Sequence, residues 1–326
     1  MSTSAQKTAV ITGLRGQDGS YLAEYLLAKG YRVVGTSHAA SCNFRLPELR
    51  VEVEVEQLDL SSTASVKHFI QKVRPDEVYN LAARSSSAQL FDDPIATAEI
   101  NGLAAVRFLE AIREVSPLTR FCQAASSEMF AGVDISPQDE STPYRPINAY
   151  GAAKTFAANM VAAYRVRHRL FATTAILFNH ESPRRGMDYV TRKITHTVAK
   201  IALGQEKDLT LGSLDSLRDW GNACDYARAM WLMLQQQTAE DFVIATGETH
   251  SVREFCEVAF SHVGLNYLDF VRIDPQWARR AETIELRGNS TKIKQLGWQP
   301  SVGFADLVRL MVNADIDLLK SNSNQH

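Results

Sequence analysis

The chain has 326 residues, 45% of them hydrophobic and 22% charged, which is enough apolar material for a core and shows no signature of disorder. A formal net charge of −2 excludes the basic excess of nucleic-acid-binding proteins, and no apolar run reaches the roughly 20 residues that span a membrane. Four scattered cysteines, with no CxxC motif, indicate a reducing cytoplasmic location and neither a disulfide framework nor a metal site.

Strand-like and helix-like segments alternate through the first half of the chain. The apolar, β-branched runs predict strands at Thr8–Thr12, Tyr31–Gly35, Glu77–Leu81 and Arg120–Ala124. Amphipathic stretches predict helices at Ser20–Lys29, Ser65–Lys72 and Asn101–Val115. This alternation is typical of a parallel sheet covered by helices. We therefore predict an α/β fold, with a Rossmann-type doubly wound sheet in residues 1–178.

The turn after the first predicted strand has GxxGxxG spacing and reads Gly13-Leu14-Arg15-Gly16-Gln17-Asp18-Gly19. Glycine lets the backbone turn tightly and approach a pyrophosphate, which the N-terminus of the following helix stabilises. The context of strand, turn and helix predicts a dinucleotide-binding site. A tight turn without a ligand is the alternative.

Two later segments lie where the same cofactor would pass. Asp59-Leu60 ends the run Val51–Leu60, and the Asp59 carboxylate suits the adenine amino group, although it also suits a helix cap. Asn80-Leu81-Ala82-Ala83 ends the next strand with small side chains. Small residues at this edge would let the cofactor lie close to the sheet.

A catalytic group is predicted around Tyr150 and Lys154, which share one face of a helix that starts after Pro146. The phenol can exchange a proton with a sugar hydroxyl, while the ammonium lowers the pKa of the phenol and contacts the cofactor ribose. Ser126-Ser127-Glu128 follows a strand and adds a hydroxyl and a carboxylate. The alternative is a surface pair on a helix and a capping serine.

The second half is less regular, with predicted helices at Val190–Leu203, Cys224–Gln236, Val252–His262 and Phe304–Leu318 among short strands. Residues 179–212 and 242–326 are predicted to form a smaller mixed α/β lobe that binds the substrate. Residues 213–241 are predicted to pack back onto the sheet.

Long strings of the sequence resemble the GDP-mannose 4,6-dehydratases, a family of extended short-chain dehydrogenases. They are GLRGQDGSYLAEYLL, NLAA, QAASSEMF, AYGAAK, ILFNHESPRRG, YVTRKIT, LGSLDSLRDWG, DYARAMWLMLQQ, VIATGETHSVREF and LGWQP. The resemblance implies dehydration of a GDP-sugar, with bound NADP taking a hydride and returning it. It implies that Tyr150 takes the 4-hydroxyl proton, Ser126 holds that hydroxyl, and Glu128 removes the C5 proton.

The resemblance also implies roles for residues outside the catalytic group. Further cofactor contacts are expected at Ser37, His38, His180 and Arg185. The GDP-sugar is expected at Ser85, Asn179, Thr191, Lys193, Arg218, Arg279 and Glu282. Lys193 and Arg218 suit a diphosphate, although Arg218 could instead pair with its neighbour Asp219.

Several positions depart from the family pattern. Ser126 stands where threonine is usual, and Ser-Ser-Glu also occurs in GDP-4-keto-6-deoxymannose reductases, so a reductase is an alternative. No arginine pair follows the second strand to bind the NADP 2′-phosphate. Arg15 is expected to supply that charge, with Ser37 and His38 adding hydrogen bonds; a solvent-exposed Arg15 and use of NAD are the alternatives.

Two changes near the sugar leave the substrate open. Arg84 stands where glutamine is common, and Arg279-Arg280-Ala281-Glu282 replaces a segment with proline. GDP-mannose is the first expectation, a GDP-manno-heptose the second, and an inactive cofactor-binding regulator the last. Apolar faces on the predicted helices Asn101–Val115 and Tyr150–Arg167 imply a dimer, with a tetramer as the alternative. Neither a nucleic acid nor a membrane is expected as a partner.

Overall fold

An eight-stranded sheet forms the centre of the computed structural model, which describes residues 6–38, 42–45, 51–85, 93–274, 276 and 285–323. The strands lie in the order β12-β7-β6-β5-β1-β2-β4-β3. They are β1 (Thr8–Thr12), β2 (Arg32–Ser37), β3 (Cys42–Arg45), β4 (Glu52–Gln57), β5 (Glu77–Asn80), β6 (Arg120–Ala124), β7 (Ala172–Leu177) and β12 (Phe242–Ile244). All neighbouring pairs are parallel except β3 with β4. The predicted parallel α/β sheet is confirmed.

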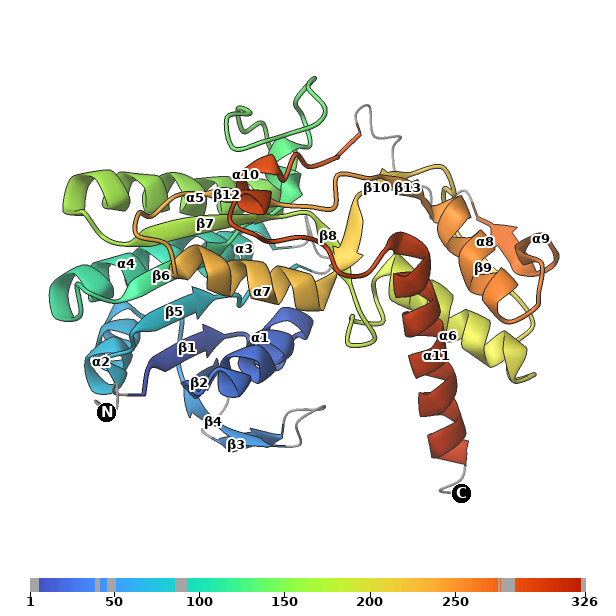
Figure 1. Cartoon of the computed structure of the whole chain (residues 1–326), viewed down its shortest axis with the longest axis horizontal. Coiled ribbons are helices and arrows are strands. Elements are labelled where there is room, and N and C mark those ends of the chain that lie inside the picture. The colour runs from blue at the N-terminus through green and yellow to red at the C-terminus, as the bar shows by residue number, and fades with distance from the viewer. Residues whose placement is uncertain are drawn as a thin grey trace.

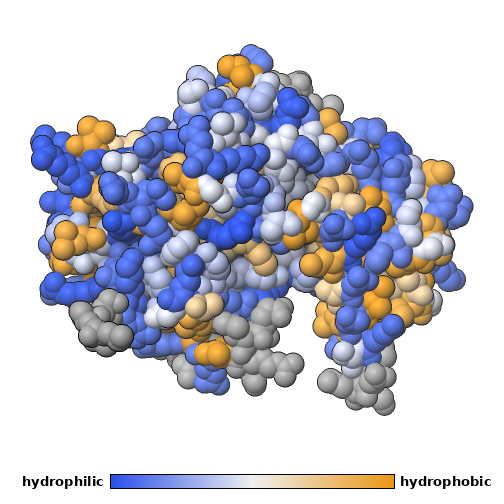
Figure 2. All heavy atoms as spheres, viewed as in Figure 1, coloured by the Kyte–Doolittle hydropathy of each residue, from blue (hydrophilic) through white to orange (hydrophobic). Residues whose placement is uncertain are grey.

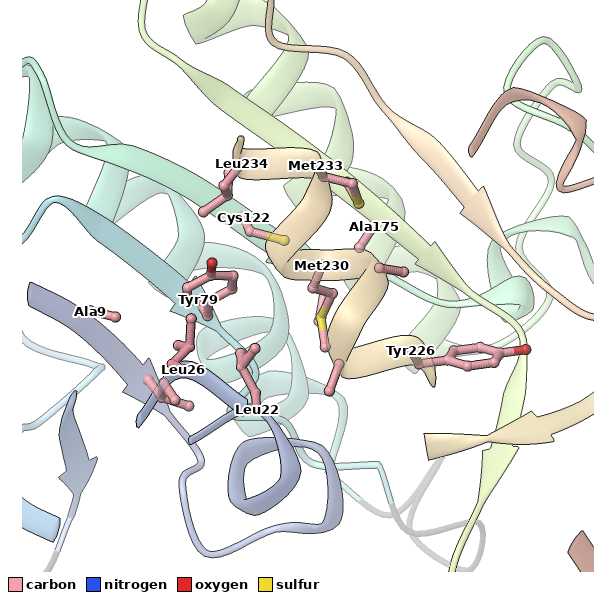
Figure 3. Packing of buried hydrophobic residues seen from close by; sticks show 14 of the residues in the cluster. Ala9, Leu22, Leu26, Tyr79, Cys122, Ala175, Tyr226, Met230, Met233 and Leu234 are labelled. Carbon is pink, nitrogen blue, oxygen red and sulfur yellow. The ribbon is translucent and has the colours of Figure 1, made fainter. Parts of the chain in front are cut away.

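Helices cover both faces of this sheet (Figure 1). On one face lie α1 (Gln17–Ala28) and α7 (Ala223–Leu234), and on the other α2 (Thr63–Val73), α4 (Ala104–Val115) and α5 (Ala149–His168). A strand buried on both faces needs apolar residues at consecutive positions, as Ala9, Val10 and Ile11 of β1 show. Figure 3 shows Met230 and Met233 of α7 in the core of this face, with Met233 near Ala175 of β7. We call this assembly the sheet unit.

A second group of elements, the small unit, packs around its own core beside the sheet unit. It contains α6 (Val190–Ala202), α8 (Val252–His262), α9 (Tyr267–Phe270) and α11 (Phe304–Ser323), with the paired strands β9 (Leu209–Leu211) and β14 (Val271–Ile273), and β10 (Leu217–Arg218) and β13 (His250–Ser251). β8 (Asn179–Glu181) and β11 (Trp220–Asn222) pair at the junction. In the face shown in Figure 2, hydrophobic residues interrupt a mostly hydrophilic surface on both units.

The division of the chain differs from the predicted one. β12 falls inside the range expected for the lobe, yet it pairs with β7 and extends the main sheet. Ile293 of α10 (Thr291–Lys294) and Trp298 also join the core beneath α7. Conversely, Leu214 and Trp220 pack in the small unit, although they lie in the range expected to return to the sheet. The chain therefore alternates between the units more often than the predicted ranges allow.

The predicted helix Asn101–Val115 is interrupted at its start. α3 (Pro94–Ala98) leads into a π-helical turn, Glu99–Leu103, before α4 begins. The buried Asn101 amide lies in this turn and bonds the backbone of Arg84 twice, accepting from its N–H at 2.9 Å and donating to its oxygen at 3.0 Å. Such turns recur at functional sites. Here it holds the segment that follows β5.

A side chain from another segment bonds a backbone group of the edge strand β12. The backbone N–H of Val243 donates to the Glu140 carboxylate at 2.7 Å.

Within the described residues, no helix is long and apolar enough to cross a membrane.

Candidate active site

A cavity of about 390 Å³ opens between the two units, at the carboxyl ends of β5, β6 and β7. Ligands of doubly wound sheets bind at this edge. Fourteen of the predicted site residues line it: Asp18, Leu81, Ala83, Ser85, Ser126, Glu128, Tyr150, Lys154, Asn179, His180, Arg185, Thr191, Lys193 and Arg218. The structure thus brings the predicted catalytic group together with residues from both units.

The glycine turn lies directly against the segment Asn80-Leu81-Ala82-Ala83. Gly13 has a φ of +71°, and a Cβ there would come within 3.0 Å of the Ala82 backbone. A Cβ on Gly19 would come within 2.3 Å of the Gly13 oxygen. Gly16 is the N-cap of α1 and, among the described residues, no side chain caps this helix. These are the properties of a cradle for a dinucleotide phosphate.

Gln17 and Asp18, the first residues of α1, contact β8. Gln17 Nε2 donates to the His180 oxygen at 3.0 Å, and Asp18 Oδ2 lies 2.9 Å from His180 Nε2. Burial opposes ionisation of Asp18, but the His180 charge and hydrogen bond outweigh it and lower the pKa of Asp18 to about 2. Burial likewise opposes the charged form of His180, yet Asp18 raises the pKa of that imidazole. The pair joins the glycine turn to the floor of the cavity.

Asp59 and Leu60, predicted near the adenine, do not line this cavity. The Asp59 carboxylate accepts from the Ser61 backbone at 2.9 Å and from the Ser61 hydroxyl at 2.6 Å, and these bonds lower the pKa of Asp59. The Leu60 oxygen accepts from Arg107. The Asp59 carboxylate thus stabilises the turn before α2. This local role resembles the helix cap that was the alternative to adenine binding.

The residues expected around the 2′-phosphate lie outside the cavity as well. Arg15 is exposed in the glycine turn. Ser37 ends β2, the next strand along the sheet, and His38 follows it. Arg279 and Glu282 lie outside the described residues. The contacts predicted for these five residues therefore remain predictions.

The catalytic group is assembled by two local structures. Ser126 follows β6 and caps the short helix Ser127–Phe130, its hydroxyl accepting from the Glu128 N–H at 3.2 Å. Gly151 lets α5 approach this helix, since a Cβ there would meet the Glu128 oxygen at 2.6 Å. Lys154, with 1% of its surface exposed, donates to the Ala124 oxygen at 2.7 Å. The hydroxyl, carboxylate, phenol and ammonium thus face one space.

The electrostatics of Tyr150 differ from the expectation. Burial raises the pKa of Tyr150, the charges of Tyr189 and Glu128 add to the rise, and a hydrogen bond with Ser126 and the charge of Arg185 oppose it. The Lys154 ammonium, 5.7 Å from the Tyr150 ring centre, does not reverse this balance. Burial also lowers the pKa of Lys154 itself to about 8, against the charge of Asp18. Burial therefore favours the neutral form of the Tyr150 phenol.

The substrate side of the cavity is already organised by contacts among its own residues. Thr191 Oγ1 donates to Glu181 Oε2 at 2.5 Å, and Arg185 Nε lies 3.2 Å from the same oxygen. Lys193 Nζ donates to the Thr210 oxygen at 2.7 Å, and burial lowers the pKa of Lys193. The Arg185 guanidinium and the Lys193 ammonium both suit a diphosphate at the cavity wall.

Arg218 lines the cavity, and its neighbour Asp219 is bonded by other segments of the chain. The buried Asp219 carboxylate accepts from the backbone and hydroxyl of Thr246 and from the backbone N–H groups of Gly247 and Gly288. Arg218 Nη1 donates to the Leu217 oxygen at 2.7 Å. Asp219 therefore orders two loops, and Arg218 faces the space where a substrate would enter.

Residue-by-residue reasoning missed Asn148, Glu181 and Tyr189. Tyr189 lines the cavity, and its ring stacks beneath the Arg185 guanidinium at 3.6 Å. Glu181 also lines it, while Asn148 bonds Glu128 at 2.7 Å. Glu181 and Tyr189 lie within strings that carry the family resemblance, and Asn148 directly precedes another, but no local pattern marked any of the three.

Comparisons with known proteins agree with this geometry. A family model described as GDP-mannose 4,6 dehydratase matches residues 10–311. The chain is 45% identical to GDP-mannose 4,6 dehydratase 2 of Arabidopsis thaliana, over 97% of this chain and 88% of that protein. It is 43% identical to GDP-mannose 4,6 dehydratase of Homo sapiens, over 98% and 94%. The solved UDP-glucose 4-epimerase of Thermus thermophilus with NAD is 25% identical, with a TM-score of 0.81 over 94% and 98%.

Proposed function

The chain belongs to the GDP-mannose 4,6-dehydratase family, and from this premise we propose that it converts GDP-mannose to its 4-keto-6-deoxy derivative. The observation that carries the proposal is the convergence of Ser126, Glu128, Tyr150 and Lys154 on one cavity between the units. Oxidation alone needs the hydroxyl, phenol and ammonium. The carboxylate adds the base that elimination of water requires.

NADP is the cofactor that we propose, and the glycine turn fits it. The close approaches at Gly13 and Gly19 and the N-terminus of α1 form the phosphate cradle, and Lys154 would contact the nicotinamide ribose. When bound, NADP would accept a hydride from C4 of the sugar and return it at C6.

The protein's own groups would move the protons. Tyr150 Oη takes the proton of the 4-hydroxyl, which the Ser126 hydroxyl holds in place. The resulting 4-ketone makes the C5 proton acidic. The Glu128 carboxylate removes that proton and passes it to the 6-hydroxyl, which leaves as water. The proton taken by Tyr150 then returns at C5 when the hydride returns at C6. Only the phenolate of Tyr150 can accept this proton. Because burial raises the pKa of Tyr150, the Lys154 ammonium and the positive charge of bound NADP would have to stabilise that phenolate.

The test is incubation with GDP-mannose and less than one equivalent of NADP, with the product read by mass. Loss of one water without net formation or consumption of NADPH supports the dehydratase. Stoichiometric consumption of NADPH by a 4-keto sugar would instead support the reductase. A GDP-manno-heptose tried in parallel distinguishes the two substrates. Binding of NADP without turnover of either sugar would support the inactive regulator.

Self-association through α5 and the helical segment that runs from α3 into α4, which includes the predicted range Asn101–Val115, is part of the same proposal. Ile95 and Phe156 are 78% and 42% exposed, and the Phe156 ring lies beside Gly102 of the π-helical turn. Exposed apolar groups gathered on adjoining helices are typical of a subunit interface. We propose a cytoplasmic dimer, with a tetramer as the alternative. A monomer mass in light scattering would contradict both.

A further inference from the structure

We infer that Asn148 is a positioning residue that holds the Glu128 carboxylate in register with the helix carrying Tyr150. The inference rests on the proposed function, since it concerns the base for the C5 proton. Asn148 does not line the cavity, so its action is indirect.

The two ends of the Asn148 side chain have different partners. Its Oδ1 accepts from the Gly151 backbone N–H at 2.7 Å and so caps α5. Its Nδ2 donates to Glu128 Oε2, also at 2.7 Å. A backbone N–H can only donate, and a carboxylate oxygen can only accept, so the orientation of the amide is fixed. One planar group therefore links the carboxylate to the first turn of α5.

This link sets the distance between two proton-transfer groups. Tyr150 lies in the first turn of α5, two residues after Asn148, and the charge of Glu128 acts on its phenol. The oxidation at C4 and the deprotonation at C5 occur at adjacent carbons, so the phenol and the carboxylate must meet one sugar in one pose. Misplacement of a reacting group by a fraction of an ångström slows such steps strongly.

The hydrogen bond also determines which carboxylate oxygen is free to react. Oε2 receives the Asn148 donor. In the part of the chain that is described, Asn148 is the side chain that donates to the Glu128 carboxylate. The other oxygen, Oε1, is therefore left to take the C5 proton. Among the other ionisable groups that line the cavity, Tyr150 interacts with the charge of Glu128, Lys154 bonds the Ala124 oxygen, and Arg185 lies 3.2 Å from Glu181.

A helix cap without a catalytic consequence is the competing explanation, and two substitutions separate it from positioning. Asn148→Asp keeps a good cap but replaces the donor with an oxygen and places a second carboxylate beside Glu128. Asn148→Gly removes the donor without adding charge and is also tolerated at a cap. Asn266→Asp is the control, because the Asn266 side chain also caps a helix, α9, and does not line the cavity.

The experiment uses the full chain with NADP and GDP-mannose and records kcat, KM and the pH profile. We expect kcat to fall at least about tenfold in both Asn148 variants, because a misplaced base loses part of the 10²–10⁴-fold that general base catalysis supplies. KM should stay within about twofold, since binding at the cavity wall is not altered. The acid side of the kcat profile should move to higher pH by about one unit in Asn148→Asp only, because a neighbouring like charge opposes ionisation.

Melting temperature serves as the stability readout. If both variants keep the kcat and pH profile of the parent chain, the positioning role is wrong and Asn148 is a cap. Loss of kcat in proportion to a lowered melting temperature, with an unshifted profile in Asn148→Asp, would overturn it as well. Failure of the proposed function would look different, because the unsubstituted chain would then release no water from GDP-mannose.

Discussion

Tyr189 donates its hydroxyl to the backbone oxygen of Ser85 at 2.8 Å, and the same hydroxyl lies 3.0 Å from Ser85 Oγ. The two residues come from opposite sides of the cavity: Ser85 follows β5 of the sheet unit, and Tyr189 is the N-cap of α6 in the small unit. The contact therefore joins the two units at the cavity that both residues line.

Tyr189→Phe should weaken substrate binding more than it slows the reaction. The ring can still stack beneath Arg185, and only the hydroxyl that joins the units is lost. A neutral hydrogen bond contributes about 0.5–1.5 kcal/mol, so we expect KM to rise roughly 2- to 10-fold with a smaller change in kcat. Steady-state kinetics with GDP-mannose measure both. An unchanged KM would show that the contact does not shape the substrate site.

Glu128→Gln should abolish dehydration while leaving the fold and cofactor binding intact. Glutamine preserves the shape of the side chain but cannot accept the C5 proton, so a loss of about 10²–10⁴-fold in kcat is expected. Mass analysis of the product and calorimetry with NADP provide the two readouts. Full activity in this variant would remove Glu128 from the mechanism.

Arg15→Thr should weaken NADP binding much more than NAD binding. Arg15 is exposed in the glycine turn, and a guanidinium bonded to the 2′-phosphate would contribute about 1.5–3 kcal/mol. Calorimetry on cofactor-stripped protein compares the two dissociation constants. Equal losses for both cofactors would place Arg15 at the shared pyrophosphate instead.

Asp18→Asn should destabilise the cofactor-free protein more at pH 6 than at pH 9. The depressed pKa of Asp18 gives stability that is present above its usual value of 3.8 and lost as pH falls toward 2. The raised pKa of His180 gives stability that is present below 6.5 and lost as pH rises through its folded value. The ion pair is therefore complete between these limits.

The expected cost of Asp18→Asn at pH 6 is on the order of 2 kcal/mol, because one unit of pKa corresponds to about 1.4 kcal/mol. Urea unfolding at the two pH values gives the comparison, with Asp208→Asn on the exposed surface as control. An equal loss at both pH values would mean that the charge on His180 contributes nothing.

Local patterns were sufficient to predict the parallel sheet, the glycine turn and the position of the proposed catalytic residues at one cavity. These features depend on residues close in sequence, such as Tyr150 and Lys154 on one helix, or on the rule that parallel strands end at one edge. The π-helical turn was not predictable, because the amphipathic pattern of Asn101–Val115 continues through it.

Contacts between distant segments were also out of reach. Ser85 and Tyr189 are 104 positions apart, and neither stands in a pattern that points to the other. The short strand β12 was assigned to the wrong unit because three apolar residues fit a strand in either core. Only packing against β7 decides between them.

The alternation of the chain between the two units bears on how a ribosome-bound chain can fold. β7 is made well before β12, its partner at the edge of the sheet, and Trp298 beneath α7 is made later still. At a synthesis rate of about 5–20 residues per second, the nascent chain carries an open strand for several seconds. The Glu140 carboxylate covers the edge of the sheet only through Val243 of β12. It cannot protect β7 before β12 has been made. During that interval the open edge of β7 can pair with another chain. A chaperone is suited to prevent that pairing.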